Sequence, residues 1–352
     1  MLEIKDFRRD LSDFTIEVEE LSIKQGETYA LLGPSGAGKT QFLLSIAGFT
    51  SLQNGIIRVA GRDVSQSPPE NRDISIIFQN PSLFPHLDVR RNIEFGNRKT
   101  LTPELLIELL DLADILDIPI RQLSGGQTQL VALARALTPQ PRVLLMDEPF
   151  AALDGQTRRL LINRFKMVQK QLGTTCLLVT HNLEDCVSLA DKVGILEKGS
   201  LVESGNTKHI FNSPGSAEIA SFLGLENLFP GTVQYETAEV QLSFDCEGFP
   251  ATFNSEHNIL HVLARNEGLA YALIRPQDIT LSTAQPISTS ALNVLPGTIV
   301  DSLEQRSIFM LTVDTGLRFK VMVTPQSFRE LNLSNQKEVF LSFKASAIKI
   351  YQ

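Results

Sequence analysis

The sequence predicts an α/β domain built on a mostly parallel sheet, followed by an all-β domain of barrel-like character. Up to about residue 225, short apolar strand patterns alternate with helical patterns, which is typical of a sheet with helices on its faces. Beyond that point the helical periodicity fades, and short alternating segments with Gly and Pro dominate. We therefore expect two domains, at residues 1–225 and 226–352.

Composition narrows the class of protein. A chain of 352 residues with 43% hydrophobic content can form more than one large core. A formal net charge of −8 argues against a general nucleic-acid binder, which normally shows a basic face, and leaves local basic patches open. The cysteines, Cys176, Cys186 and Cys246, form no C-x-x-C motif, so neither zinc nor a disulfide framework is indicated, as in a reducing cytoplasm. The N-terminus lacks a signal-peptide core and no apolar run approaches membrane-spanning length, so a membrane role would be peripheral.

A phosphate-binding motif lies early in the chain. Residues 33–40 fit the P-loop pattern G-x-x-x-x-G-K-[ST]. A short apolar strand pattern precedes the motif at 27–32, and a helical pattern follows at 41–47 and ends at Gly48. The motif consists of Gly33, Pro34, Ser35, Gly36, Ala37, Gly38, Lys39 and Thr40.

This loop has the chemistry to hold a nucleoside triphosphate. Backbone N–H groups can surround phosphate oxygens, Lys39 would reach the β- and γ-phosphates, and the Thr40 hydroxyl would ligate Mg²⁺. The plainer alternative is a Gly-rich turn with an incidental Lys. An aromatic from the first strands can stack on the base; Phe14 is our choice, with Phe7 second, and a place in a strand core is as good an explanation of either.

The segments around the P-loop follow in order. Residues 1–25 alternate as antiparallel strands do, and residues 55–64 form a hairpin pattern bounded by glycines. A buried strand at 74–78 ends at Gln79. The apolar loop after it, residues 81–87, is either a docking surface or a loop packed on its own domain.

Helical patterns then alternate with two more strands. Residues 89–118 are mostly helical, and a helix that opens after Ser124 ends before two prolines. A strand buried on both faces covers 143–148, a helix covers 155–172 and a strand covers 176–180. In such sheets ligands bind at the carboxyl ends of the strands. We therefore expect one site to collect the residues at those ends, Gln79, Asp147, Glu148 and His181.

The C-terminal region contains a short internal similarity. Residues 227–233 and 293–299 share four identical positions of seven, and alternating strand patterns follow both. Two related β-barrel-like lobes explain this similarity, and chance resemblance between two strand entries is the alternative.

The ordered motifs resemble the ATP-binding subunits of ABC transporters, over residues 1 to about 225. Besides the P-loop there are a Q-loop at Gln79, a Walker B strand at 143–148 and a switch histidine, His181. The signature motif spans 123–127, and Asp154 closes a D-loop at 152–154. The resemblance implies a helical subdomain at about 88–138. It also implies a homodimer in which each signature, with Ser124, Gly125, Gly126 and Gln127, closes on ATP held by the other subunit.

The resemblance and the chemistry assign the same roles. Glu148 can accept a proton from water, and Asp147 and Gln79 can hold the Mg²⁺ shell. His181 can hold the γ-phosphate, and Lys39 neutralises its charge. The expected activity is ATP hydrolysis with ATP and Mg²⁺ bound. Solvated carboxylates and a structural histidine are the simpler alternatives.

A cassette followed by a β-domain resembles the importers of molybdate, tungstate, sulfate, ferric ion and sugars. This implies a permease partner in the membrane, an extracytoplasmic solute-binding protein, and a location at the cytoplasmic face of the inner membrane. We favour molybdate or tungstate, because three C-terminal stretches resemble molybdate-binding barrel motifs, in which hydroxyls and a Lys hold an oxyanion. The expected regulatory oxyanion residues are Ser290, Asn293, Thr324, Ser327, Lys344 and Ser346.

Other functions stay open. The C-terminal domain can be a dimerisation scaffold without a ligand, in an importer for sulfate, ferric ion or another solute. ABC proteins of DNA repair or translation usually carry coiled coils or two cassettes in one chain, and neither is present here.

Overall fold

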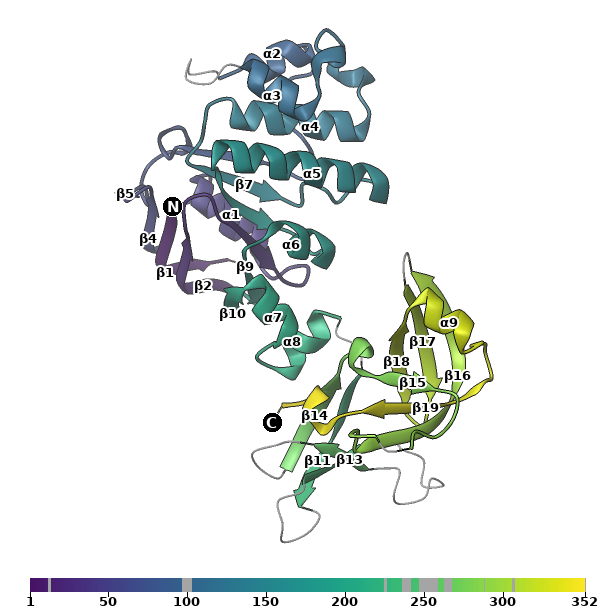
Figure 1. The fold of residues 1–352 in the computed structure, drawn as a ribbon. Coiled ribbons are helices and arrows are strands. Elements are labelled where there is room, and N and C mark those ends of the chain that lie inside the picture. The colour runs from purple at the N-terminus through teal and green to yellow at the C-terminus, as the bar shows by residue number, and fades with distance from the viewer. Residues whose placement is uncertain are drawn as a thin grey trace. The chain divides into compact units, whose positions relative to one another are not determined.

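The computed structural model divides the chain into two compact units, Met1–Ser213 and Pro214–Gln352 (Figure 1). Each unit is described by itself. The structure describes residues 1–11, 14–96, 103–224, 227–235, 242–246, 259–262, 268–287, 289–305 and 308–351.

The first unit is built on a ten-stranded sheet in the order β5-β4-β1-β2-β10-β9-β3-β8-β7-β6. Its strands are β1 (Leu2–Asp10), β2 (Thr15–Ile23), β3 (Thr28–Leu32), β4 (Asn54–Val59), β5 (Arg62–Asp63), β6 (Ile74–Ile77), β7 (Val143–Asp147), β8 (Thr175–Val179), β9 (Lys192–Glu197) and β10 (Ser200–Asn206).

Half of this sheet is parallel. β9, β3, β8, β7 and β6 run in one direction, and every residue of β3, β7 and β8 is buried. Runs of Leu, Val and Ile suit strands that are covered on both faces. The other half joins β10, β2, β1, β4 and β5 mainly through antiparallel pairs, so the sheet is less parallel than we expected. The carboxyl ends of β3, β8, β7 and β6 therefore meet at one edge.

Helices cover the sheet and form a subdomain. Figure 1 shows α2, α3 and α4 gathered at one end of the unit, with α5 beneath them. Among the described residues, no helix combines the length and apolar character needed to cross a bilayer. The helices of this unit are α1 (Lys39–Ala47), α2 (Val89–Glu94), α3 (Pro103–Leu110), α4 (Gly125–Leu137), α5 (Gly155–Leu172), α6 (Leu183–Leu189) and α7 (Thr207–Asn212).

The second unit begins before the boundary expected at residue 225. Its first helix, α8 (Ala217–Phe222), buries Ala217 and Ala220 against Leu273 and Tyr351 of the β-domain. This apolar contact, which the local helical pattern does not reveal, attaches α8 to the second unit. The remaining elements are β11 (Leu228–Tyr235), β12 (Leu242–Cys246), β13 (Ile259–Val262), β14 (Gly268–Ile274), β15 (Thr280–Ser282), β16 (Asn293–Gln305), β17 (Ile308–Asp314), β18 (Arg318–Val323), α9 (Pro325–Glu330), β19 (Glu338–Phe343) and β20 (Ile348–Tyr351).

The β-strands of this unit form two five-stranded sheets of the same design. Their orders are β13-β12-β11-β14-β20 and β15-β19-β16-β17-β18, so β11 and β16 hold equivalent central places. These strands carry the two similar segments of the sequence. In each half the fourth strand is followed by a 3₁₀ turn and a fifth strand that joins the other sheet. Each sheet is therefore completed by the other half of the chain.

Candidate nucleotide site

The P-loop is shaped by close backbone approaches. A Cβ atom at Gly33 would lie 2.2 Å from the carbonyl oxygen of Leu196, so only glycine fits there. Gly38 has φ 99° and directly precedes α1. A side chain at this left-handed position would be strained and would meet Ile16. The first N–H groups of α1 have no intrahelical acceptor and can bind a phosphate oxygen.

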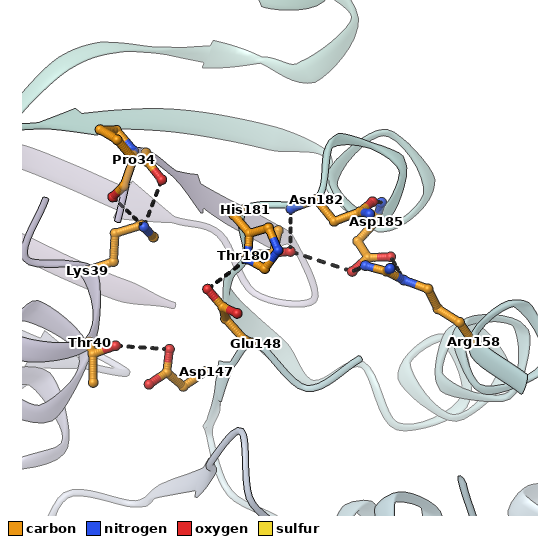
Figure 2. Close-up of polar contacts among 11 residues, drawn as sticks. Pro34, Lys39, Thr40, Asp147, Glu148, Arg158, Thr180, His181, Asn182 and Asp185 are labelled. Atoms are coloured by element: carbon orange, nitrogen blue, oxygen red, sulfur yellow. Dashed lines mark hydrogen bonds and ion pairs between the residues drawn. The ribbon is translucent and has the colours of Figure 1, made fainter. Parts of the chain in front are cut away.

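Lys39 is held inside this loop. Its ammonium donates to the carbonyl oxygens of Gly33 at 2.7 Å and Pro34 at 2.9 Å, and the residue is 7% exposed (Figure 2). Burial lowers the pKa of Lys39, while the charges of Glu148 and Asp147 oppose that shift. Since carbonyls are weaker partners for an ammonium than phosphate oxygens, this cation is ready to exchange them for an anion.

Thr40 and Asp147 bring two oxygen donors together. The Thr40 hydroxyl donates to Oδ1 of Asp147 at 3.2 Å (Figure 2). Burial raises the pKa of Asp147, and the negative charge of Glu148 adds to this rise. The hydrogen bond from Thr40 and the positive charge of Lys39 oppose it. A hydroxyl and a buried carboxylate are the hard oxygen ligands that Mg²⁺ takes beside phosphate oxygens, so the donor set fits this ion.

Glu148 and His181 face each other across the ends of β7 and β8. The Nδ1 atom of His181 lies 2.9 Å from Oε1 of Glu148 (Figure 2). Glu148 has φ 46°, and its N–H donates to the carbonyl of Val179 on β8, which fixes its backbone beside His181. Gln79 is exposed two residues after β6, the strand that pairs in parallel with β7. The edge of the sheet thus collects the four predicted strand-end residues.

The structure distinguishes the two aromatic candidates. Phe7 is 1% exposed and packs edge-on against Phe42, with ring centroids 4.8 Å apart, so it belongs to the core. Phe14 is only partly buried, and its ring lies 3.1 Å from the Cβ position of Gly38. Of the two, Phe14 is therefore the aromatic beside the P-loop.

The signature and the D-loop form a second group. Ser124 caps α4 in a reciprocal pair with Gln127, in which each side chain accepts from the other residue's N–H, and both Ser124 and Gly125 are exposed. A Cβ atom at Gly126 would lie 2.5 Å from Thr157, so α4 and the start of α5 are in close contact. Asp154 caps α5 by accepting from the N–H groups of Gln156 and Thr157. A hydrogen bond from the Thr157 side chain, and then these backbone bonds, lower the pKa of Asp154. Both motifs present helix N-termini.

Part of the loop at 81–87 packs on its own domain, and part of it is exposed as a docking surface would be. Leu83 lies in the core, and the ring of Phe84 contacts Phe95 at 4.3 Å and the guanidinium of Arg135 at 5.0 Å. The buried Asn92 side chain binds the backbone of Phe84 in both directions. These residues pack on their own domain, while Pro85 and His86 remain exposed.

The predicted oxyanion residues fall into two groups. Asn293 begins β16 opposite the last residue of β19, next to Lys344, and the side chains of Ser290, Lys344 and Ser346 are exposed. The hydroxyls of Thr324 and Ser327 are 2.9 Å apart at the start of α9, and the strand register puts them at the other end of β16. Figure 1 likewise shows α9 away from the point of the β19 arrow. Within one chain, the two groups of predicted oxyanion residues therefore lie at opposite ends of β16 and do not form a single site.

Sequence reasoning missed a set of polar anchors. The buried Arg72 donates to the carbonyls of Ser45 and Ile46 at the end of α1 and to those of Ser65 and Ser67. A second anchor is the ion pair between Arg158 and Asp185 beside His181 (Figure 2). Charged residues in separate segments usually indicate solvated faces, so no local signal marks these pairs.

Comparison with known proteins agrees with this geometry. Residues 17–151 match the ABC transporter family, and residues 289–350 match the TOBE domain. The molybdate/tungstate import ATP-binding protein WtpC of Pyrococcus abyssi is 36% identical over 360 residues, which span 100% of both chains. The spermidine/putrescine import ATP-binding protein PotA of Thermobifida fusca is 35% identical and covers 77% of this chain and 71% of its own.

Solved structures support the same fold. cbiO1 from Clostridium perfringens, part of the ABC transporter complex cbiONQ, has a TM-score of 0.55 and 27% identity, and covers 60% of this chain and 90% of its own. An ATP-binding cassette in its ADP conformation has a TM-score of 0.56 at 22% identity, over 63% of this chain and 98% of its own, and so speaks for the fold alone. The predicted α/β fold and β-rich C-terminal domain are confirmed. The chain belongs to the ATP-binding proteins of ABC transporters and is an ATPase.

Proposed function

We propose that this chain is the ATP-hydrolysing subunit of an importer for molybdate or tungstate. The observation that carries the import of these ions is the full-length similarity to molybdate/tungstate import proteins, which includes the C-terminal domain. The observation that carries hydrolysis is the cluster of Lys39, Thr40, Asp147, Glu148 and His181 at one edge of the sheet.

In this proposal the P-loop holds the triphosphate of ATP. The backbone N–H groups at 33–40 bind phosphate oxygens, and Lys39 turns from the two loop carbonyls to the β- and γ-phosphates. Phe14, which lies beside Gly38, stacks on the adenine. Thr40 and Asp147 would hold Mg²⁺, with Gln79 near its shell, and the ion would supply charge neutralisation to the phosphates.

Hydrolysis itself needs a base for the attacking water. Glu148 takes the proton from that water, since it lies at the strand end beside the phosphate loop. His181 orients the Glu148 carboxylate through their 2.9 Å contact and reaches the γ-phosphate when ATP is bound. Glu148 has a strained backbone at φ 46°, and its side chain contacts this histidine.

Two chains form the complete sites in this proposal. The exposed N-terminus of α4, at Ser124 and Gly125, closes on the ATP of the partner, and Asp154 faces the same interface. A helix N-terminus is a suitable surface for a phosphate because its free N–H groups and dipole favour negative charge. A homodimer then contains two composite sites.

The membrane partners follow from the import role. The permease docks beside the Q-loop, where Pro85 and His86 are exposed and where Phe49 and Phe95 are each more than half exposed. The chain then works at the cytoplasmic face of the membrane, and the solute-binding protein acts through the permease on the other side.

The C-terminal domain senses the oxyanion in this proposal. Lys344, Ser346 and Ser290 of one chain face Thr324 and Ser327 of the other, because a single chain separates the two groups. Asn293, which is 2% exposed, is buried at the start of β16 and does not face the partner. Hydroxyl donors and one ammonium suit a tetrahedral dianion. Binding in trans would favour a dimer state that holds the ATPase domains apart and so slows import.

The test is transport by the reconstituted permease complex with its solute-binding protein. We expect ATPase activity to rise when molybdate or tungstate is supplied on the side of the solute-binding protein, and not with spermidine, sulfate or ferric ion. Inhibition by the oxyanion is expected from the opposite side, where the C-terminal domain lies. Stimulation by spermidine alone would favour polyamine import, which the similarity to spermidine/putrescine import proteins makes the second candidate. In that outcome the C-terminal domain is a dimerisation scaffold.

A further inference from the structure

We infer that Arg158 and Asp185 are positioning residues for ATP hydrolysis, which fasten the turn that carries His181 to the helix that begins at Asp154. The inference rests on the proposed roles of Glu148 and His181. It adds a mechanical link, within one chain, between the proposed dimer interface and the residues that act on water and phosphate.

The link is a two-pronged ion pair between two helices. Nε of Arg158 on α5 donates to Oδ1 of Asp185 at 2.7 Å, and Nη2 donates to Oδ2 at 2.5 Å. The Asp185 side chain on α6 is 2% exposed and the Arg158 side chain 17%. A bidentate guanidinium–carboxylate pair fixes the distance and the relative direction of its two partners.

On one side, Asp185 organises the turn around His181. The Thr180 hydroxyl lies 3.5 Å from Oδ2 of Asp185 and accepts from the N–H of Asn182 at 3.0 Å. The Asn182 side chain accepts in turn from the N–H of Asp185 at 3.1 Å. Figure 2 shows His181 between these residues and Glu148. The imidazole is therefore carried by a turn whose polar groups bond to one another and to both the backbone and the carboxylate of Asp185.

On the other side, Arg158 belongs to the first turn of α5. Its N–H donates to the carbonyl of Asp154 at 2.9 Å, and the Asp154 carboxylate caps the same turn. A displacement of Asp154 on closure with a partner would move Arg158 with it. Through Asp185 the same displacement reaches the His181 turn.

Stability alone is a weak reason for this pair. Desolvation of two charges offsets most of their attraction, and apolar pairs of similar volume often replace buried ion pairs without loss of stability. What an apolar pair cannot supply is the fixed direction of the hydrogen bonds to the turn. The pair is thus better suited to holding His181 in place than to holding the helices together.

The test compares variants of the full chain in steady-state ATP hydrolysis. In Arg158→Met/Asp185→Leu, an apolar replacement of the pair, we expect kcat to fall about 10- to 100-fold, because misplacement of reacting groups by about 1 Å costs that much. The KM and the equilibrium affinity for ATP should stay within about threefold, since the P-loop is untouched. The melting temperature should change little. Arg158→Lys, which keeps the charge without the fork, should retain an intermediate kcat.

Controls separate this inference from a structural role and from the proposed function. The control is Arg164→Met. Arg164 lies on α5, as Arg158 does, but it pairs with Asp111 at the end of α3 and does not contact the His181 turn. Its loss should leave kcat within about twofold of the wild-type value. A wild-type kcat in the double variant, or in Arg158→Lys if the double variant does not fold, would overturn the inference. Glu148→Gln is assayed in parallel: if it too retains turnover, the proposed catalytic roles fail and not merely this link.

Discussion

The imidazole of His181 and the carboxylate of Glu148 are in direct contact, with 2.9 Å between Nδ1 and Oε1, although the two residues follow different strands of the sheet. β7 and β8 are paired in parallel, so their carboxyl ends coincide and the two side chains share one edge. This contact occupies the proposed base, so in the proposed mechanism His181 leaves Glu148 for the γ-phosphate before Glu148 serves the attacking water.

The role of Glu148 is tested by Glu148→Gln. The amide keeps the shape of the side chain but cannot accept the proton, so kcat should fall by about 10²- to 10⁴-fold while ATP still binds. ATP should also trap the closed dimer, which gel filtration detects. The matched control is Glu70→Gln, at an exposed glutamate in a 3₁₀ turn, which should hydrolyse ATP normally. Hydrolysis by Glu148→Gln at the wild-type rate would refute the general-base role.

The composite site is tested by Ser124→Arg. A long cation at the exposed N-terminus of α4 would collide with the partner's nucleotide, so ATP should bind but no longer drive dimerisation in light scattering. Ser124→Ala is the control, because it removes the cap at a cost of about 1 kcal/mol without adding bulk. If Ser124→Arg dimerises with ATP as the wild type does, the signature does not face the partner's site.

The buried Arg72 should prove a major support of the P-loop helix. Arg72→Met removes a side-chain donor from four backbone carbonyls, two of them at the end of α1, and of these Ser45 still accepts from the N–H of Gly48. The free energy of unfolding should therefore fall by about 2–4 kcal/mol. Urea denaturation measures this change, and Arg62→Met, at an exposed arginine, should change it by less than about 0.5 kcal/mol. Equal stability of the two variants would contradict the structural role of Arg72.

Replacing Asp147 with Asn should raise the stability of the fold but weaken ATP binding. Burial raises its pKa above the ordinary 3.8, so the folded state holds a proton more readily than the unfolded state. Stability from this group therefore falls as pH rises from 3.8 through the raised pKa, and its charge costs most at pH 7. Asp147→Asn should raise the melting temperature of the nucleotide-free chain at pH 7, and the gain should disappear as the pH approaches 3.8.

The same variant should weaken Mg²⁺-dependent ATP binding by at least about tenfold, since a carboxylate ligand is lost. Asp154→Asn is the comparison of opposite sign, because hydrogen bonds lower the pKa of Asp154, and it should gain no stability at pH 7. A lower melting temperature of Asp147→Asn at pH 7 would show that its charge stabilises the fold.

Regulation by the oxyanion is tested with Lys344→Ala. Removing the ammonium should weaken tungstate and molybdate inhibition of the transporter ATPase, by about 5- to 150-fold if the full coupling is lost, with no change in basal activity. Arg318→Ala, at an exposed cation on the edge strand β18, should leave inhibition unchanged. Sulfate serves as the anion control. Inhibition that is absent in the wild type, or as strong in Lys344→Ala, would favour the scaffold alternative.

The sequence by itself determined the α/β fold, the β-rich C-terminal domain and the identity of the motif residues. These are local properties: apolar runs mark the buried strands, Gly48 and Gly173 end two helices in left-handed conformations, and the P-loop pattern joins a strand to a helix. The rule that parallel strands end at one edge then predicted where the polar strand-end residues would gather. The phosphate-binding chemistry of the P-loop depends on residues that are neighbours in the chain, so the order of those residues was enough to predict it.

Only the tertiary structure decided which partners each side chain meets. Phe7 and Phe14 carry the same strand pattern, yet packing against Phe42 buries the first and leaves the second beside Gly38. The Arg158–Asp185 pair and the exchange of strands between the two β-sheets join segments far apart in the chain. Hydrophobic burial and hydrogen bonding stabilise such contacts to a degree that depends on all the surrounding residues. Those residues come from distant parts of the chain, so a local sequence pattern cannot predict which contacts form.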